Sequence, residues 1–362
     1  MPIIRIQNLN GSSDFNYYAG AYDSKIEVDT GQLLFAWSGS RGTSFGPHIW
    51  KGPKAVLNYH TWKVRAREGC DSNFLLHLLR YLTVKIENSA HGAAALVHTQ
   101  KGEVEDFAAI VPPLPEQRQI AEILSTWDRA IEKVDALITN GLAKRNALEQ
   151  SLLTGRRRLP GFTETWSVTA IGAVAEEVSE RAGEMSDLPV LSCSKHDGMV
   201  LSLSYFKKKV YSDDTSNYKV MRRGTFGFPS NHIEEGSIGY QDIVEAGIVS
   251  PIYCVFRSNG KIDDGYLRRL LKTDRYRQIF AAATNASVDR RGSLRWKEFA
   301  KIQLPLPPLK EQIAISEVID AAQEVERAYA SQLAALRQEK SALMQQLLTG
   351  KRRVKVDERE PA

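Results

Sequence analysis

The chain has 362 residues, of which 43% are hydrophobic and 25% charged, as is ordinary for a globular protein of two or three domains. Its net charge of +5 permits a nucleic-acid partner without indicating one. The sequence contains no apolar run long enough to cross a bilayer, and its three scattered cysteines argue against a disulfide framework or a zinc site. We therefore expect a cytoplasmic protein with no membrane segment and no metal.

The first stretch, residues 1–111, is predicted to be a compact α+β domain of short β-runs, glycine turns and one or two helices. Its start is expected to be shortened, because residues 2–4 align best with residues 188–190 of a related block further along. The counterpart of residues 162–187 would then be missing from the first block. Three tryptophans are expected in its core rather than against a ligand: Trp37, Trp50 and Trp62.

A long helix is predicted for residues 112–158. Its seam residues recur at alternating steps of four and three, the a/d pattern of a coiled coil. From Glu116 to Thr154 the helix would span about 58 Å at 1.5 Å per residue, and Gly155 suits a left-handed C-cap. The seam positions are Ile120, Leu124, Trp127, Ile131, Val134, Ile138, Gly141, Arg145, Leu148 and Leu152.

The same plan then repeats, with a second α+β domain at residues 159–306, a second helix at 307–354 and a disordered tail at 355–362. The second helix follows the first at a shift of about 195 residues, which indicates two tandem structural units. The domains are related more weakly, at a shift of about 192. The second seam comprises Ile315, Ile319, Ala322, Glu326, Tyr329, Leu333, Leu336, Lys340, Leu343 and Leu347.

The polar residues in the two seams favour antiparallel pairing of the helices. In that arrangement Gly141 faces Glu326, and Arg145 can reach Glu326 between neighbouring layers. Lys340 would then lie near Trp127 and could make a cation–π contact. Parallel pairing would instead bring Arg145 beside Lys340, which is repulsive. The alternative is two independent helices, each packed on its own domain.

The combination resembles a known family, the specificity (S) subunits of type I restriction–modification systems. Two copies of one helix signature carry the resemblance, supported by two motifs within the domains. The helices open with Pro-Leu-Pro-Glu-Gln at 113–117 and Pro-Leu-Lys-Glu-Gln at 308–312, and close with Leu-Leu-Thr-Gly and basic residues at 152–158 and 347–353. The domain motifs lie at 33–40 and at 236–239 followed by 250–253.

This resemblance implies two target-recognition domains, each reading half of a split double-stranded DNA target, and an antiparallel coiled coil that sets the gap. The coiled coil would also dock two modification (methyltransferase) subunits, and through them the restriction subunits. The chain itself would be non-catalytic and without a cofactor. S-adenosylmethionine, ATP and Mg²⁺ would be bound only by the partner subunits.

With DNA as the implied partner, basic side chains suit phosphates and polar side chains suit base edges. We hypothesise that residues 38–43 and 230–232, each just after a β-run, face the duplex; a solvated surface is the alternative for each basic cluster. The first-domain candidates are Arg5, Asn8, Ser38, Ser40, Arg41 and Thr43. The second-domain candidates are Lys195, His196, Lys207, Lys208, Arg222, Arg223, Ser230, Asn231, His232, Arg290, Arg291 and Arg295. The basic clusters at 156–158 and 351–353 are expected to cap helix dipoles.

Two other classes of protein remain as alternatives. A self-contained DNA methyltransferase or nuclease would need its own active site, but the sequence has no phosphate loop, no dinucleotide fingerprint and no Asn/Asp-Pro-Pro-Tyr/Phe tetrapeptide. We therefore expect no catalytic residue. A coiled-coil adaptor without DNA contact is disfavoured by the paired domains and their basic clusters.

Overall fold

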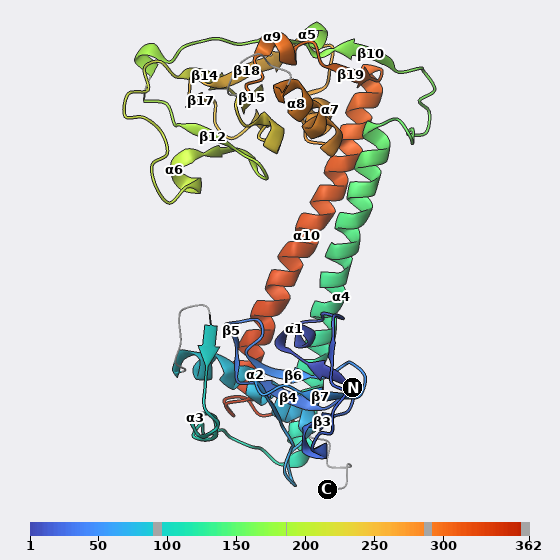
Figure 1. Cartoon of the computed structure of the whole chain (residues 1–362), viewed down its shortest axis with the longest axis vertical. Coiled ribbons are helices and arrows are strands. Elements are labelled where there is room, and N and C mark those ends of the chain that lie inside the picture. Colours follow the sequence, from blue (N-terminus) through green and yellow to red (C-terminus); the bar gives the residue numbers. More distant parts are fainter. Residues whose placement is uncertain (90–95, 186, 286–291, 356–362) are drawn as a thin grey trace. The chain divides into compact units, whose positions relative to one another are not determined.

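The computed structural model describes residues 1–89, 96–185, 187–285 and 292–355, and it divides into two compact units (Figure 1). The first unit comprises Met1–Ile138 and Ala328–Ala362, and the second comprises Thr139–Arg327. Each unit therefore contains one α+β domain together with a part of each long helix. No helix within the described ranges combines the length and the hydropathy needed to cross a membrane.

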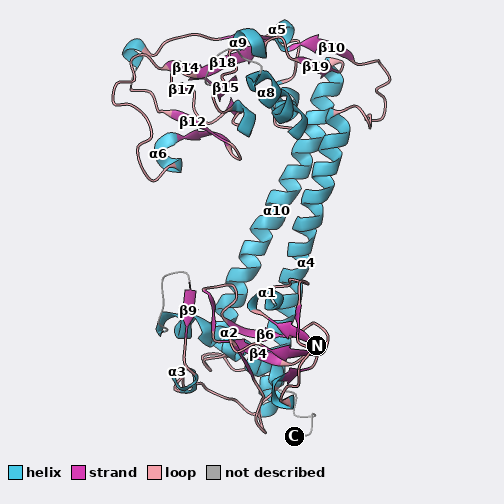
Figure 2. Cartoon of the chain, viewed as in Figure 1, coloured by secondary structure: helices cyan, strands magenta, loops and turns pink. Residues whose placement is uncertain are grey.

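The domain of the first unit is built from short strands and one long helix (Figure 2). One sheet has the order β2-β1-β7-β3, a second has the order β6-β4-β8, and β5 pairs with β9. The strands are β1 (Pro2–Ile4), β2 (Asn16–Tyr17), β3 (Glu27–Val28), β4 (Leu33–Ala36), β5 (Ser38–Ser40), β6 (Gly46–Ile49), β7 (Ala55–Leu57), β8 (Thr61–Lys63) and β9 (Leu96–His98). The helices are α1 (Ile6–Leu9), η1 (Ser24–Ile26), α2 (Ser72–Ser89) and α3 (Lys101–Glu105).

The core of this domain extends into the long helices. Helix α2 buries Phe74 and Leu78 against Ile120 and Leu124 of the first long helix, and the cluster also includes Leu347 of the second. Among the three tryptophans expected in the core, Trp50 is 3% exposed. Trp62 stacks on Phe35 with ring centroids 5.9 Å apart, and Trp37 stacks on Trp62 at 6.0 Å.

The second unit contains an antiparallel sheet of order β11-β18-β15-β16 and three strand pairs, β10–β19, β12–β13 and β14–β17. Its strands are β10 (Ser167–Ala170), β11 (Ala175–Glu177), β12 (Leu191–Ser194), β13 (Gly198–Leu201), β14 (Lys219–Arg222), β15 (Thr225–Pro229), β16 (Gly239–Gln241), β17 (Ala246–Val249), β18 (Tyr253–Ser258) and β19 (Gln303–Leu306). Its helices are α5 (Ile171–Val174), η2 (Gly183–Met185), α6 (Ser202–Tyr205), η3 (Ile233–Glu235), α7 (Asp264–Leu271), α8 (Asp274–Asn285) and α9 (Trp296–Phe299).

An aromatic cluster fills the core of the second unit. Phe256 stacks on Phe226 at a centroid distance of 5.0 Å and lies 5.2 Å from Phe299. Ile315 and Ile319 of the second long helix belong to the same buried cluster. In each unit, therefore, the domain and the long helices share one hydrophobic core, which fixes the domain on its part of the coiled coil.

The long helices are α4 (Leu114–Leu153) and α10 (Leu309–Leu347), and they pair antiparallel as predicted (Figure 1). In the second unit, Arg145 Nε donates to Glu326 Oε1 at 3.0 Å, and a Cβ added at Gly141 would lie 3.7 Å from Glu326 Cγ. In the first unit, Lys340 bonds to Asp128. The predicted ion pair between Arg145 and Glu326 is thus present.

The predicted contact between Lys340 and Trp127 is wrong. Within the described residues the Lys340 ammonium pairs instead with the carboxylate of Asp128, which also accepts a hydrogen bond from Arg80 at 2.8 Å. A charged hydrogen bond to a half-buried carboxylate is stronger than a contact with a ring face, so the neighbouring aspartate determines where Lys340 points.

The helix signature makes the same contacts in both units. Glu311, which is fully buried, accepts two bonds from Arg158 at 2.5 and 2.7 Å. Glu116 accepts two hydrogen bonds from Arg353 at 2.8 and 2.5 Å. This ion pair holds the pKa of Glu116 below its usual value. We call these two ion pairs the clasps. They give the last arginine of each basic cluster a partner at the start of the opposite helix, in place of the dipole capping that we expected.

The glutamine that follows each clasp glutamate also has matched roles. Gln117 accepts from the backbone N–H of Asp71 at 2.8 Å, and Gln312 accepts from that of Asp263 at 2.8 Å. Each glutamine therefore ties the start of a long helix to the start of a domain helix. The expected domain boundaries stay predictions, and the expected disordered tail lies, apart from Lys355, outside the described residues.

Candidate nucleic-acid interface

The second unit contains a cleft of about 880 Å³. Its walls are the tip of the β12–β13 hairpin, the corner between α7 and α8, and the parts of α4 and α10 that belong to this unit. The hairpin contributes residues 195–199, the corner contributes residues 268–276, and the long helices contribute Arg145, Glu149, Gln323 and Arg327, among others.

Basic groups outnumber acidic groups around this cleft. The lining includes seven lysines and arginines but four aspartates and glutamates. The basic residues are Arg145, Lys195, Arg268, Arg269, Lys272, Arg275 and Arg327, and the acidic residues are Glu149, Asp197, Asp242 and Asp274. The cleft is therefore electropositive at neutral pH, as a site for an anion requires.

All four acidic groups already have partners. Asp197 accepts a hydrogen bond from Tyr205 at 2.7 Å, and Asp274 pairs with Arg277 at 3.0 Å. Asp242 lies 3.8 Å from Arg268, and Glu149 lies 3.7 Å from Arg145. Burial also raises the pKa of Glu149, which weakens its negative charge.

Three of the basic groups have no acidic partner within the described part of the chain. Lys195 and Arg275 are exposed and make no side-chain hydrogen bond or ion pair there. Lys272 donates to two backbone carbonyls, of Lys195 at 3.1 Å and of Gly236 at 3.0 Å. Partial desolvation of its ammonium lowers the pKa of Lys272.

Arg269 forms the floor of the cleft. Its side chain is 5% exposed, bonds to Asp320, and donates from Nη1 to the carbonyl of Gly265 at 2.7 Å. Its Nε is buried and has no hydrogen-bond partner among the described residues. Burial lowers the pKa of Arg269, because the charged guanidinium has lost water.

Two predicted DNA contacts, Lys195 and His196, lie in this cleft, whereas the other second-domain candidates that the structure describes lie outside it. Arg222 pairs with Glu180 at 2.6 Å and Arg223 with Glu245 at 2.7 Å, so their charges are neutralised locally. Lys207, Lys208 and Arg295 are exposed. Arg290 and Arg291 lie outside the described residues.

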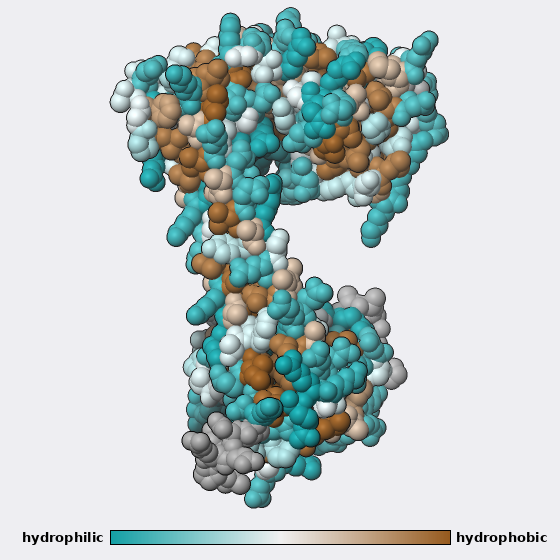
Figure 3. All heavy atoms as spheres, turned by 180° about the vertical axis from the view of Figure 1, so that it is seen from behind, coloured by the Kyte–Doolittle hydropathy of each residue, from teal (hydrophilic) through white to brown (hydrophobic). Residues whose placement is uncertain are grey.

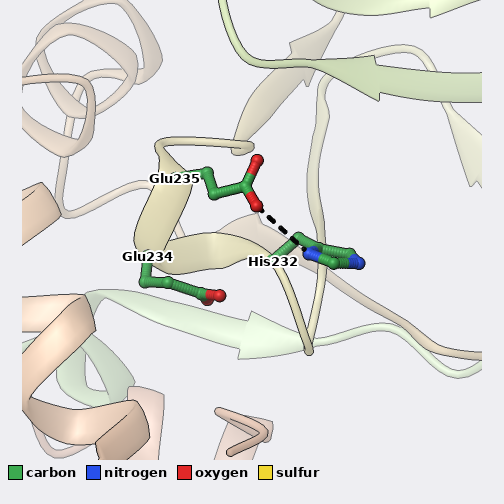
Figure 4. Close-up of side chains that lie close together, drawn as sticks. All are labelled: His232, Glu234 and Glu235. Carbon is green, nitrogen blue, oxygen red and sulfur yellow. Dashed lines mark ion pairs between the residues drawn. The ribbon is translucent and has the colours of Figure 1, made fainter.

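The predicted reading loop Ser230–Asn231–His232 leads into the short turn η3. Two carboxylates follow directly, and His232 Nδ1 lies 3.5 Å from Glu235 Oε1 (Figure 4). The ligand atoms of His232, Glu234 and Glu235 lie within 4.8 Å of one another, as in a metal site. His232 and Glu235 are exposed, whereas Glu234 Oε2 is buried and has no hydrogen-bond partner among the described residues. The two carboxylates would repel a phosphate, so this loop suits base edges better than the DNA backbone.

In the first domain, the candidates separate into buried and exposed groups. Asn8 is 6% exposed, and its amide donates to the carbonyls of Ser12 and Asp14 at 3.0 and 2.9 Å. Arg5 donates to the same Asp14 carbonyl at 2.8 Å, and Ser38 is buried in β5. The groups that reach solvent are Ser40, Arg41 and Thr43, at the turn after β5.

Sequence reasoning missed the basic side of the α7–α8 corner. Arg268, Lys272 and Arg275 lie four and three residues apart in the sequence, but α7 ends at Leu271 and α8 begins at Asp274, so they do not share one helix face. That spacing was visible in the sequence. The α7–α8 corner and the hairpin holding Lys195 lie about 75 residues apart in the chain, however, and only the folded unit brings them together.

The comparisons with known proteins agree with this architecture. Residues 1–139 match the family model described as the type I restriction modification DNA specificity domain. The chain is 25% identical over 358 residues to the type I restriction enzyme MjaVIII specificity subunit of Methanocaldococcus jannaschii, covering 92% of this chain and 82% of that protein. It is 27% identical over 138 residues to the EcoBI specificity subunit of Escherichia coli, covering 38% of this chain and 28% of that protein.

Solved structures show the same fold at low sequence identity. A chain from a type I R-M system matches with a TM-score of 0.58 and 18% identity, covering 97% of this chain and 92% of that chain. The type I restriction-modification S subunit from M. genitalium matches with a TM-score of 0.53 and 15% identity, covering 88% and 83%. The resemblance carried by the duplicated helix signature is confirmed: along most of its length, this chain is similar to the specificity subunits of type I restriction–modification systems.

Proposed function

We propose that the chain is the DNA sequence-recognition subunit of a type I restriction–modification complex, and that it reads a split target with one domain for each half. One observation supports this most directly. The two units attach unlike domains to the paired helices through like contacts, the clasps Glu116–Arg353 and Glu311–Arg158. Two different domains that are attached to the helices in the same way suit a target made of two different half-sites.

The paired helices have the further role of docking the partner subunits. They carry exposed apolar side chains, Leu137 in the first unit and Leu142 and Val325 in the second. Figure 3 shows such apolar side chains among polar ones on the paired helices. Single exposed apolar residues are common on protein surfaces, so the docking role rests on the family resemblance rather than on these side chains. Two modification subunits would bind there, with the restriction subunits joining through the assembled complex.

The chain supplies recognition and the partners supply chemistry. Its relatives are specificity subunits, which are non-catalytic. S-adenosylmethionine, ATP and Mg²⁺ are accordingly assigned to the partner subunits. The alternative, a self-contained methyltransferase or nuclease, predicts a different result in a simple assay.

The assay compares the purified chain with the chain plus its modification subunits, both supplied with duplex DNA and S-adenosylmethionine. We expect adenine methylation only when the modification subunits are present, because the sequence of this chain lacks the Asn/Asp-Pro-Pro-Tyr/Phe tetrapeptide typical of adenine methyltransferases. DNA that is methylated or cut by the chain alone would show that it is an enzyme. DNA that is not bound even by the assembled complex would favour an adaptor without DNA contact.

A further inference from the structure

Three observations converge on the cleft of the second unit. The first is the set of basic groups without acidic partners, Lys195, Lys272 and Arg275, which come from two separate elements. They are not scattered over a surface, because Lys272 bonds to the backbone of Lys195 and so joins the α7–α8 corner to the hairpin tip. The electropositive rim is therefore held in place by the fold.

The second observation is the start of helix α8, which lies on the cleft wall. Lys272, Thr273 and Asp274 all line the cleft, and the 12-residue helix begins at Asp274. Thr273 Oγ1 accepts from the N–H of Tyr276 at 3.4 Å, as an N-cap residue does. The first turn of a helix presents free N–H groups and a partial positive charge, both of which favour a phosphate.

The third observation is Arg269 at the floor. A guanidinium that is 5% exposed and retains an unpartnered Nε is costly, because a buried donor without an acceptor loses the free energy of its hydration. Asp320 compensates for part of its charge but bonds at a different nitrogen. An anion bound in the cleft would lie close to the Arg269 guanidinium and stabilise its positive charge.

We propose that the cleft seats a phosphodiester of the DNA backbone, held by Lys195 and Arg275 above the buried guanidinium of Arg269. This inference rests on the proposed function and adds to it the place where the second unit grips its half of the target. Phosphate contacts position a protein on the duplex and carry no sequence information. Phosphate binding in the cleft would therefore fix the position of the second unit along the DNA, and with it the bases that the neighbouring loops can contact.

The test measures the salt dependence of DNA binding by the chain together with its modification subunits. Each phosphate contact contributes about 0.9 to the slope of log affinity against log salt. We expect the double variant Lys195→Ala/Arg275→Ala to flatten the slope by about one unit on any duplex sequence, because the cleft seats one phosphodiester. The single variant Arg275→Lys should keep the slope of the unmodified complex, because it keeps the charge.

A matched control is the double variant Arg257→Ala/Lys261→Ala. It removes one arginine and one lysine from the same unit, and both are exposed and outside the cleft. We expect its slope to equal that of the unmodified complex. This control separates a seated phosphate from a general loss of positive charge.

The outcomes distinguish this inference from the proposed function. If the unmodified complex binds DNA and the cleft variant keeps the same slope, the cleft is not the phosphate seat, although the proposed function stands. If the unmodified complex does not bind DNA at all, both claims fail. If inorganic phosphate saturates the cleft at micromolar concentration without weakening DNA binding, the ligand is a free anion and the inference is overturned.

Discussion

Removing one heptad from each long helix, residues 131–137 from α4 and residues 330–336 from α10, is expected to shorten the gap between the two half-sites of the proposed target. A heptad contributes about 10 Å of helix, and DNA rises about 3.4 Å per base pair. The preferred gap should therefore shrink by up to about three base pairs. Affinity for the original target should fall by about 100-fold or more, because one domain must give up base contacts worth about 1–3 kcal/mol each.

These segments are chosen so that the shortened helices can still pair. Both lie in the first unit, and each contains two seam positions, Ile131 and Val134 in α4, and Leu333 and Leu336 in α10. A deletion of seven residues keeps the a/d pattern of each seam in phase. Deleting residues 131–137 alone is the control, because it leaves the two seams out of register and should lower the thermal unfolding midpoint.

The measurement is selection of preferred targets from a pool of duplexes in which the gap between the half-sites varies. Selection of the original gap by the doubly shortened chain would show that helix length does not set the spacing. An equal loss of affinity for every gap would instead point to a defect in folding, which circular dichroism would reveal.

The second large effect concerns His77, a fully buried imidazole between α2 and the long helices. Its side chain is 1% exposed, its Nε2 lies 3.1 Å from Ser125 Oγ, and its Nδ1 has no hydrogen-bond partner among the described residues. Burial, opposed by Asp128 and aided by Arg80 and Lys340, lowers the pKa of His77 to about 4. The imidazole is therefore neutral at pH 7.

We expect the free energy of unfolding to fall as the pH decreases from about 6.5 to about 4. In that window the unfolded chain binds a proton at His77 and the folded chain does not, so protonation favours unfolding. The loss should be on the order of 3 kcal/mol over the window, since one pKa unit corresponds to about 1.4 kcal/mol. Above pH 6.5 the effect should vanish, because neither state is protonated.

Chemical denaturation of His77→Gln across the same pH range tests this expectation. Glutamine removes the titration and retains a polar group beside Ser125, so the pH dependence should decrease. His48→Gln is the matched variant. Burial also lowers the pKa of His48, so this residue makes its own contribution to the pH dependence of the unfolding free energy. The pKa of the clasp carboxylate Glu116 is also lowered, so Glu116 adds a loss of stability only at the acidic end of the window. An unchanged profile for His77→Gln would show that His77 is not the group responsible.

The contacts that sequence predicted are those set by a local period. The a/d steps predicted the helices, and the polar residues in the seams predicted their antiparallel pairing, which places Arg145 against Glu326. The same pairing brings Glu116 close to Arg353, so the clasps could have been predicted as well. They were missed because the signature was treated as a marker of helix ends and not as a set of charges.

Tertiary structure determines the rest. Asn8 has the side chain of a base-reading residue, yet the fold uses its amide within its own loop. Arg222 and Arg223 form a basic pair in the sequence, but Glu180 and Glu245 neutralise them in space. Conversely, Lys272 and Arg275 belong to the cleft only because the chain returns to the β12–β13 hairpin. Which charges stay free therefore depends on long-range packing that no local pattern encodes.

The central claim is that the chain recognises a split DNA target with two different readers. Mapping methylated adenines in the genome of cells that carry this chain with its modification subunits tests it most directly. The account predicts methylation at one recurring target made of two specific half-sites separated by a fixed stretch of unspecified bases. Methylation at a single undivided site, or with one specific half-site alone, would contradict it.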